Sequence, residues 1–301
     1  LYLWTADPAT LPLSEHESQL LAHKQAYLNV PFFLARAALY SVIWAVAALV
    51  LCRRSALRDR EAPVERSATS NAATSSAERA FSAALLPAVC LALTFASFDW
   101  LMSLQPFWMS SIFGVYLFAG GFVASLGLVA LLAHAAARSA SVPIRGPHFH
   151  ALGRMMFGFT IFWAYIAFFQ ALLIALPNRP DEVLFYVRRL EGGWRAVAWT
   201  LVAARFVVPF FVLLPKAIKF RARVMAWVGA GLVLGHYLDV YWLVMPMQPG
   251  HGPLPGVWDA SALLALGGTF GLAAAGWLHG KRLVPINDPQ LVRSIHYRSP
   301  L

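Results

Sequence analysis

Six residues that can ionise or form strong hydrogen bonds stand inside stretches of sequence that are otherwise apolar. A charged side chain is costly in a hydrocarbon surrounding, so it persists there where it is paired, hydrated or used. We therefore regard these residues as candidates for carrying protons or for contacting the head group of a quinone. They are Asp99, Tyr165, Gln170, Arg205, His236 and Asp239.

His236 and Asp239 have the most informative spacing. They are three residues apart, so a helix would place both side chains on one face. In that arrangement a carboxylate can orient an imidazole, or the two groups can exchange a proton. Arg205 would supply the positive charge that keeps a carboxylate ionised, and Tyr165 and Gln170 would position water.

The same residues also fit a purely structural interpretation. An arginine that pairs with an aspartate can fasten helices together in a membrane without any role in transport. Arg205 would then pair with Asp239 or with Asp99, and Arg36 adds a further charge near the start of the first apolar stretch. Acid–base groups slightly outnumber what strict pairing requires, which favours the functional interpretation by a small margin.

The sequence predicts no metal or redox centre within this chain. Its two cysteines, Cys52 and Cys90, are too few for a CxxCH haem site or an iron–sulfur cluster site. His16 and His23 fit a solvated helix face better than a metal site. Nucleotide-binding, zinc-protease and serine-hydrolase motifs are missing from the sequence. Any redox centre in its pathway would belong to another subunit or a mobile carrier, and independent catalysis is not expected.

Composition indicates the medium that surrounds these residues. Of 301 residues, 59% are apolar and 13% are charged, against about 25% charged in an average soluble domain. The net charge of +10 arises mainly from basic residues in short segments between apolar stretches, not on one helix face. This distribution is typical of membrane topology, so no nucleic-acid partner is expected.

Seven apolar stretches are long enough to cross a hydrocarbon core of about 30 Å. The sequence therefore predicts an all-α, polytopic membrane protein with a transmembrane domain over 30–280. Residues 1–29 would form an interfacial segment whose polar helix leads into the first span at Pro31, and 281–301 would form a tail. The predicted spans are 30–52, 80–104, 110–135, 150–177, 194–214, 223–247 and 258–280.

Lysine and arginine are distributed unequally between the two sides that these spans define. Segments 53–79, 136–154 and 215–223 and the tail after 280 hold 17 of them, and the opposite side holds five. The side richer in lysine and arginine is normally cytoplasmic. The N-terminal segment and the connections at 105–109, 178–195 and 248–257 would then face outward. Segment 53–79, rich in Arg, Ser and Ala, is predicted to be a solvated loop.

Several segments, taken together, resemble one family of membrane subunits. They are His23–Phe33, Asp99–Pro106, Ser111–Tyr116, Phe162–Phe168 and His236–Pro246. As a set they resemble the ActF-like, NrfD-type (polysulfide-reductase membrane-subunit-like) subunits of bacterial alternative complex III. The resemblance covers most of the chain, from about residue 20 to residue 247.

The resemblance implies a multi-pass subunit of the bacterial cytoplasmic (inner) membrane. Its complex oxidises quinol, such as menaquinol, and passes electrons through iron–sulfur clusters and haem c to an acceptor. The implied partners are an NrfD-like sister subunit, an iron–sulfur subunit, a multihaem cytochrome c subunit, other membrane subunits, lipids and a terminal oxidase. The ActF-like subunit holds no redox centre and is implicated in proton translocation through polar half-channels. Quinol oxidation is assigned to the sister subunit.

Two features of this chain differ from the family pattern. The family fold has about ten spans, so three would precede Leu1. After Gln170, the family's aromatic, Asn-containing run is replaced by Ala171–Asn178, which alters the outer part of a path along the fourth span.

Three hypotheses therefore remain open. The first is a proton-translocating subunit, the second is direct quinone binding by this chain, and the third is a non-catalytic membrane scaffold for the redox subunits.

Overall fold

The computed structural model describes residues 2–6, 11–60, 68–138, 143–177, 179–248, 252–280, 284, 288 and 290–299. Within these residues the chain is helical and forms no strand. Seven of the described helical segments are long and apolar enough to cross a membrane, which confirms the predicted fold class. These spans are Val30–Asp59, Arg79–Leu104, Phe113–Ala137, Gly146–Ala175, Trp194–Leu213, Ala222–Met247 and Val257–Leu278.

The described α-helices follow one another in chain order. Their bounds are α1 Glu15–Lys24, α2 Val30–Arg60, α3 Ala68–Trp100, α4 Phe113–Ala137, α5 Gly146–Ala175, α6 Pro180–Leu190, α7 Trp194–Val202, α8 Val208–Leu213, α9 Lys216–Lys219, α10 Ala222–Val244, α11 Val257–Leu278 and α12 Leu291–Ile295. A π-helical turn, Ala203–Val207, joins α7 to α8 within one continuous span.

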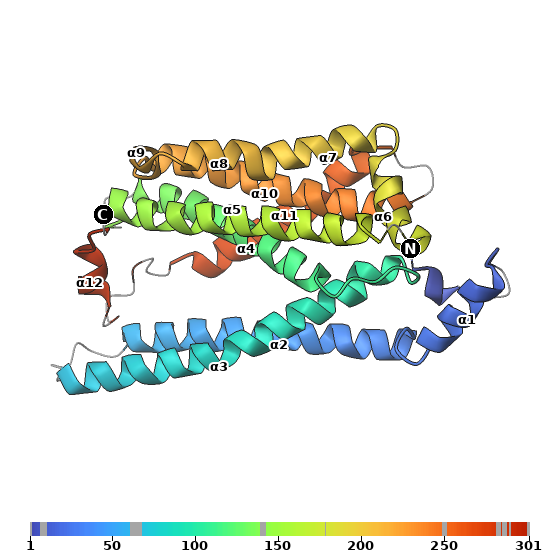
Figure 1. The fold of residues 1–301 in the computed structure, drawn as a ribbon. Helices are drawn as coiled ribbons and strands as arrows, with labels where there is room; N and C mark the ends of the chain where they lie inside the picture. The colour runs from blue at the N-terminus through green and yellow to red at the C-terminus, as the bar shows by residue number, and fades with distance from the viewer. Residues whose placement is uncertain are drawn as a thin grey trace.

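Helices α4, α5, α7–α8 and α10 pack into a bundle, and α2 and α3 form a separate pair beside it (Figure 1). Helix α3 contacts α4, so the pair is joined to the bundle through that helix. Every residue of α11 is described, and none of them is buried. The bundle therefore provides most of the buried interior.

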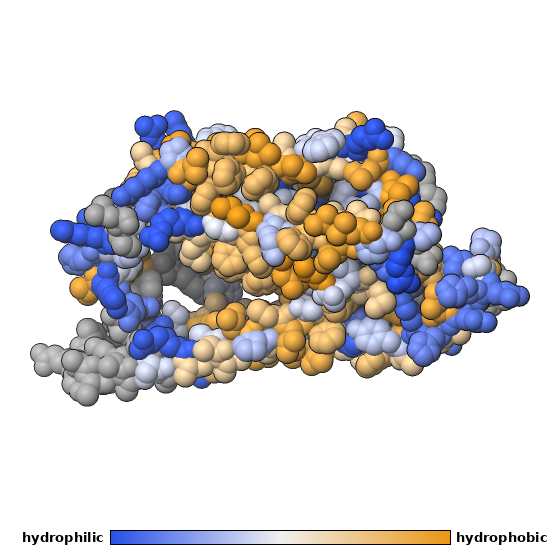
Figure 2. Space-filling model, in the orientation of Figure 1, coloured by the Kyte–Doolittle hydropathy of each residue, from blue (hydrophilic) through white to orange (hydrophobic). Residues whose placement is uncertain are grey.

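The surface of the helices is apolar over most of its length. Figure 2 shows hydrophobic residues across the middle of the molecule and hydrophilic residues gathered at its two ends. Leu132, Phe211 and Trp227 are all more than 60% exposed on this surface. A protein with so extensive an apolar surface would not be soluble in water, so this surface is expected to contact the hydrocarbon core of a membrane. The protein is a multi-pass membrane protein.

Helices α4 and α10 approach each other at two facing glycines. A Cβ atom placed on Gly127 would lie 2.7 Å from the carbonyl oxygen of Gly229, which is closer than real Cβ contacts. Small residues at such a crossing allow two helix backbones to touch and to gain van der Waals contact. The glycines thereby fix the distance between the helices that carry Tyr116 and Asp239.

The segments between the spans contain more helix than the sequence predicted. Segment 53–79 was expected to be a loop, but α2 continues to Arg60 and α3 begins at Ala68. Alanine and arginine are among the strongest helix formers, which accounts for the extension. Residues 61–67, and residues 139–142 of the 136–154 segment, lie outside the described part of the chain.

Four of the described α-helices, α1, α6, α9 and α12, are short and lie outside the spans. The helix expected in the N-terminal segment is present as α1, whose first turn carries a capping box between Ser14 and Glu17. The 178–195 connection was expected to be a loop but contains α6, which begins at Pro180. Proline is favoured in the first helical turn because its missing N–H is not needed there.

We predict that alanine destabilises the protein at Gly127 but not at Gly231. Gly127→Ala should destabilise the protein by about 1–3 kcal/mol, because the added methyl group overlaps the backbone of α10. Gly231 is on α10, and a Cβ added there would meet nothing within 4 Å, so Gly231→Ala should be neutral or stabilise by up to about 1 kcal/mol. Thermal denaturation of both variants in detergent, followed by size-exclusion chromatography, measures the difference. Equal midpoints would contradict the close α4–α10 contact.

Candidate functional site

The local structure around Arg205 departs from a regular α-helix. Arg205 lies in the π-helical turn between α7 and α8, and Pro209 follows four residues later. Proline has no N–H to donate to the carbonyl four residues before it, and its ring displaces that carbonyl. A wider turn accommodates both effects, and turns of this kind are frequent at functional sites. Pro209 therefore accounts for the irregular turn that carries Arg205.

Asp239 and Arg205 form a fully enclosed ion pair. Their side chains are each 1% exposed, and an Arg205 Nη1 hydrogen bond to Asp239 Oδ2 joins them. The Tyr116 hydroxyl donates a hydrogen bond to Asp239 Oδ1. Arg205 Nη2 donates to the Gly120 carbonyl oxygen at 3.0 Å, and the guanidinium lies 4.3 Å from the centre of the Trp163 ring.

Glycines make room for this pair. A Cβ on Gly235 would lie 2.9 Å from Arg205 Cγ, and one on Gly120 would lie 3.1 Å from Arg205 Nη2. Larger residues at either position would displace the guanidinium from Asp239. We call Tyr116, Arg205, His236 and Asp239 the Asp239 centre.

His236 contacts the arginine and not the carboxylate. Its Nδ1 atom lies 3.2 Å from Arg205 Nη1, the same nitrogen that bonds to Asp239. Because a guanidinium nitrogen can only donate, Nδ1 accepts this bond and the proton of the neutral imidazole is on Nε2. The spacing correctly indicated a shared helix face. The predicted direct contact between His236 and Asp239 is replaced by a bridge through Arg205.

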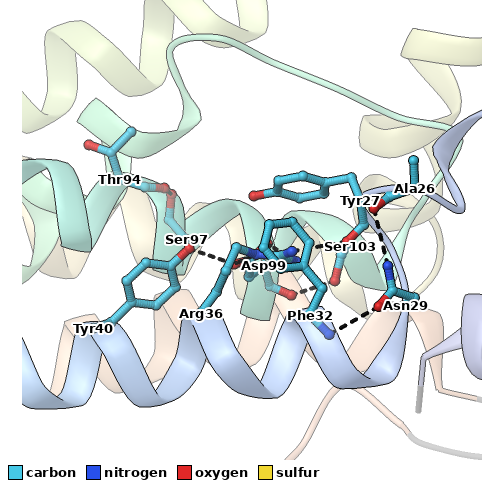
Figure 3. Close-up of polar contacts among 10 residues, drawn as sticks. All are labelled: Ala26, Tyr27, Asn29, Phe32, Arg36, Tyr40, Thr94, Ser97, Asp99 and Ser103. Atoms are coloured by element: carbon cyan, nitrogen blue, oxygen red, sulfur yellow. Dashed lines mark hydrogen bonds and ion pairs between the residues drawn. The ribbon is translucent and has the colours of Figure 1, made fainter.

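A second ion pair joins α2 to α3 (Figure 3). Arg36 Nε lies 2.8 Å from Asp99 Oδ2 and Arg36 Nη2 lies 3.0 Å from Asp99 Oδ1, a two-pronged geometry that strengthens the pair. The Tyr40 hydroxyl donates to Asp99 Oδ2 at 2.7 Å. Asp99 is fully buried. The partner of Asp99 is thus Arg36, and Arg205 pairs with Asp239.

Aromatic rings cover the outer side of Arg36. Its Cζ atom lies 3.9 Å from the centre of the Tyr27 ring and 4.2 Å from that of Phe32. Burial, and next the nearby Asp99 carboxylate, raise the pKa of Tyr27 to about 12. Tyr27 therefore keeps its proton at neutral pH and cannot act as a base. We call Tyr27, Arg36, Tyr40 and Asp99 the Asp99 centre.

Tyr165 and Gln170 lie on α5 and form no hydrogen bond with either centre in the described structure. Gln170 is buried, whereas Tyr165 is 51% exposed on the outer face of the helix. Both line an apolar pocket of about 680 Å³ whose wall also includes Tyr116 and Asp239. Tyr165 is thus half-exposed at the edge of this pocket, and its role in positioning water stays a prediction.

Sequence reasoning missed three residues of this region. The hydroxyls of Tyr40 and Tyr116 complete the two carboxylate sites, yet their partners are 59 and 123 residues away along the chain. Arg189 was counted only among the basic residues of a loop. No spacing within the sequence could reveal contacts over such separations.

Arg189 lies buried on α6, where it holds the end of α10. It donates to the carbonyl oxygens of Phe185 at 2.8 Å and of Leu243 at 2.5 Å. Leu243 is in the last turn of α10, where unpaired carbonyls carry partial negative charge and favour a cation. Burial lowers the pKa of Arg189 to about 9. Arg189 therefore caps the C-terminal end of α10, next to the pocket.

No protein-family model and no curated protein matches this sequence. In the described part of the chain, no three His, Cys, Asp or Glu side chains are grouped so that they could hold a metal ion. The fold and the site define a class: a multi-pass helical membrane protein with two buried arginine–aspartate centres.

We predict that the Arg36–Asp99 pair is needed for stability. Arg36→Leu leaves a buried carboxylate without its counter-charge and should destabilise the protein by about 3–5 kcal/mol. Replacing both Arg36 and Asp99 with leucine should recover much of that loss, because no lone charge remains. Thermal or denaturant unfolding of the purified variants measures both effects.

The exposed pair between Arg179 and Glu182, at 3.4 Å, is the matched control. Arg179 is 67% exposed, so Arg179→Leu should change stability by no more than about 1 kcal/mol. A loss at Arg179 equal to that at Arg36 would show that charge removal in general, not burial, causes the effect.

Proposed function

We propose that this chain is an ActF-like membrane subunit of a quinol:electron-acceptor oxidoreductase of the alternative complex III type. In this proposal the Asp239 centre carries protons whose movement is linked to quinol oxidation in a neighbouring subunit. The observation that supports it best is the complete burial of Asp239 and Arg205 inside a membrane-spanning bundle, with His236 and Tyr116 against them. Two of the segments on which the family resemblance depends contain Tyr116 and Asp239.

The proton step follows from the charges of the centre. In the starting state of this proposal Asp239 is a carboxylate and Arg205 is a cation, so the pair is neutral as a whole. A proton that reaches Asp239 removes the negative charge and leaves Arg205 held by the Gly120 carbonyl oxygen and by His236 Nδ1. A charge created nearby by quinol oxidation shifts the balance between these two states, because a close charge changes the pKa of a carboxyl group.

Each polar residue of the centre then has a distinct task. Asp239 holds the proton, and Arg205 sets how readily Asp239 gains or releases it. His236 accepts a hydrogen bond from Arg205 and so retains the guanidinium when Asp239 is neutral. Tyr116 donates to the carboxylate and orients it. The Asp99 centre provides a second buried carboxylate with the same types of partner.

The proposal includes the surroundings of the subunit. It would lie in the bacterial cytoplasmic membrane, with 53–79, 136–154, 215–223 and the C-terminus on the cytoplasmic side. Haem c and iron–sulfur clusters would be held by the multihaem cytochrome and iron–sulfur partners, and quinol would be oxidised in the NrfD-like sister subunit.

Membership in such a complex predicts a specific purification result. The tagged chain, extracted in mild detergent from its native membranes, should co-purify with a polypeptide that carries covalently bound haem c and with an iron–sulfur protein. Haem staining of the gel and the visible spectrum of the eluate detect both. An eluate without haem c would contradict the assignment to a complex of this type.

We predict that Asp239→Asn in the intact complex lowers the number of protons translocated per electron while quinol oxidation largely continues. The amide cannot gain or release a proton, but it retains the size of the carboxyl group. Proton release from proteoliposomes, measured together with quinol turnover, gives the ratio. Tyr116→Phe, which removes one hydrogen bond to the carboxylate, should reduce the ratio less.

Asp259→Asn is the control for this experiment. Asp259 lies at the start of α11 and accepts a hydrogen bond from the Gly256 N–H at 2.7 Å, away from both centres. Its substitution should leave the ratio unchanged. Unchanged pumping in Asp239→Asn would remove the proton-carrier role, and loss of the assembled complex in both Asp239→Asn and Tyr116→Phe would support a scaffold role instead.

A further inference from the structure

The pocket beside the Asp239 centre opens toward the space that lipid occupies. Its volume is about 680 Å³, within the range of sites that hold small organic molecules. Tyr165 and Phe168 of α5 and Trp199 of α7 line it and are between 51% and 68% exposed, so they form its mouth. A molecule dissolved in the bilayer could therefore enter between α5 and α7 without crossing water.

The inner wall of the pocket holds two buried polar atoms without a hydrogen-bond partner among the described residues, Gln170 Oε1 and Trp163 Nε1. Gln170 is 3% exposed, and its Oε1 atom accepts no hydrogen bond from any residue that the structure describes. A buried acceptor in this condition costs free energy unless something donates to it. Tyr186 also lines the pocket and interacts with the Gln170 side chain, yet Gln170 Oε1 has no hydrogen-bond partner among the described residues.

The charge of the inner wall favours a neutral ligand. Asp239 reaches the pocket, but Arg205 neutralises it, so the wall carries no net charge. The remaining lining is mostly aromatic and aliphatic, with rings from Trp163, Phe185 and Trp242. A charged head group would lose its hydration there without gaining an opposite charge.

We infer that this pocket binds a neutral, membrane-soluble molecule that has a hydroxyl-bearing head and an apolar tail. The hydroxyl donates a hydrogen bond to Gln170 Oε1, and the tail leaves through the mouth between α5 and α7. Two kinds of membrane component share this chemistry, hydroquinones and diacylglycerols. Ligand binding here is a property beyond the proton-carrying task proposed for Asp239, although a ligand in the pocket would lie against Tyr116 and Asp239.

Photochemical labelling in native membranes tests this inference. The probes are a decyl hydroquinone and a diacylglycerol, each with a diazirine in the tail, applied to membranes that contain the full chain. At least one probe should label peptides from α5 or α7, as mapped by mass spectrometry, and an excess of the same unlabelled lipid should compete. Labelling by the hydroquinone alone, by the diacylglycerol alone or by both supports the site and identifies its source.

Matched variants separate this pocket from general lipid contact. Ala198 lines the pocket, so Ala198→Phe should fill it and reduce labelling about tenfold or more, whereas Ala196→Phe on the lipid-facing side of α7 should not. Gln170→Leu, which removes the acceptor and keeps the approximate volume, should reduce labelling about fivefold. Thermal midpoints confirm that the variants remain folded.

Two outcomes overturn the inference. One is that neither probe labels α5 or α7, and the other is equal labelling in Ala198→Phe and Ala196→Phe. Because Gln170 makes no hydrogen bond with the Asp239 centre in the described structure, Gln170→Leu keeps that centre intact. Photolabelling of the pocket can therefore fail while proton translocation persists, and proton translocation can fail while photolabelling persists. The pocket and the proton-carrier role of Asp239 are thus tested independently.

Discussion

The cost of placing a charge in hydrocarbon controls the architecture of this protein. A lone carboxylate or guanidinium would be expelled toward water, so each must meet an opposite charge and further hydrogen-bonding groups inside the fold. Asp239 meets Arg205, and Asp99 meets Arg36, with a tyrosine hydroxyl on each carboxylate. Each pair joins two different helices. The arrangement of the spans therefore decides whether each buried charge meets its partner.

The backbone of the bundle is adapted to this requirement. The guanidinium of Arg205 occupies space that side chains at Gly120 and Gly235 would fill, and the irregular turn before Pro209 carries Arg205. Gly127 and Gly229 let α4 and α10 touch further along the bundle. These glycines carry no side chain, yet they determine how closely the charged groups can approach one another. A rigid, close-packed scaffold is also what a site needs if protonation of one carboxyl group is to have a defined effect on its neighbours.

The Asp239 centre and the adjoining pocket combine two environments that are seldom in contact. One wall holds a compensated charge pair, and the rest is an aromatic surface that opens between α5 and α7. A proton carrier and a neutral lipid-phase ligand would meet at Asp239 and Tyr116. A ligand that occupies or leaves the pocket would change the polarity around the carboxyl group, and hence its affinity for a proton. Such contact would physically connect the contents of the bilayer to the charge state of the bundle.

The sequence by itself predicted the fold class and the seven spans found among the described residues, because apolar stretches of this length can cross the hydrocarbon core. It also located the charged residues within those spans, and the spacing of His236 and Asp239 placed them on one helix face. Which charge pairs with which was decided by tertiary structure alone, because Arg36 meets Asp99 only through the packing of α2 on α3. The roles of Tyr116 and Arg189 emerged in the same way. A helix has a fixed period that can be read along the chain, whereas contacts between helices depend on rotation and depth, which no local spacing records.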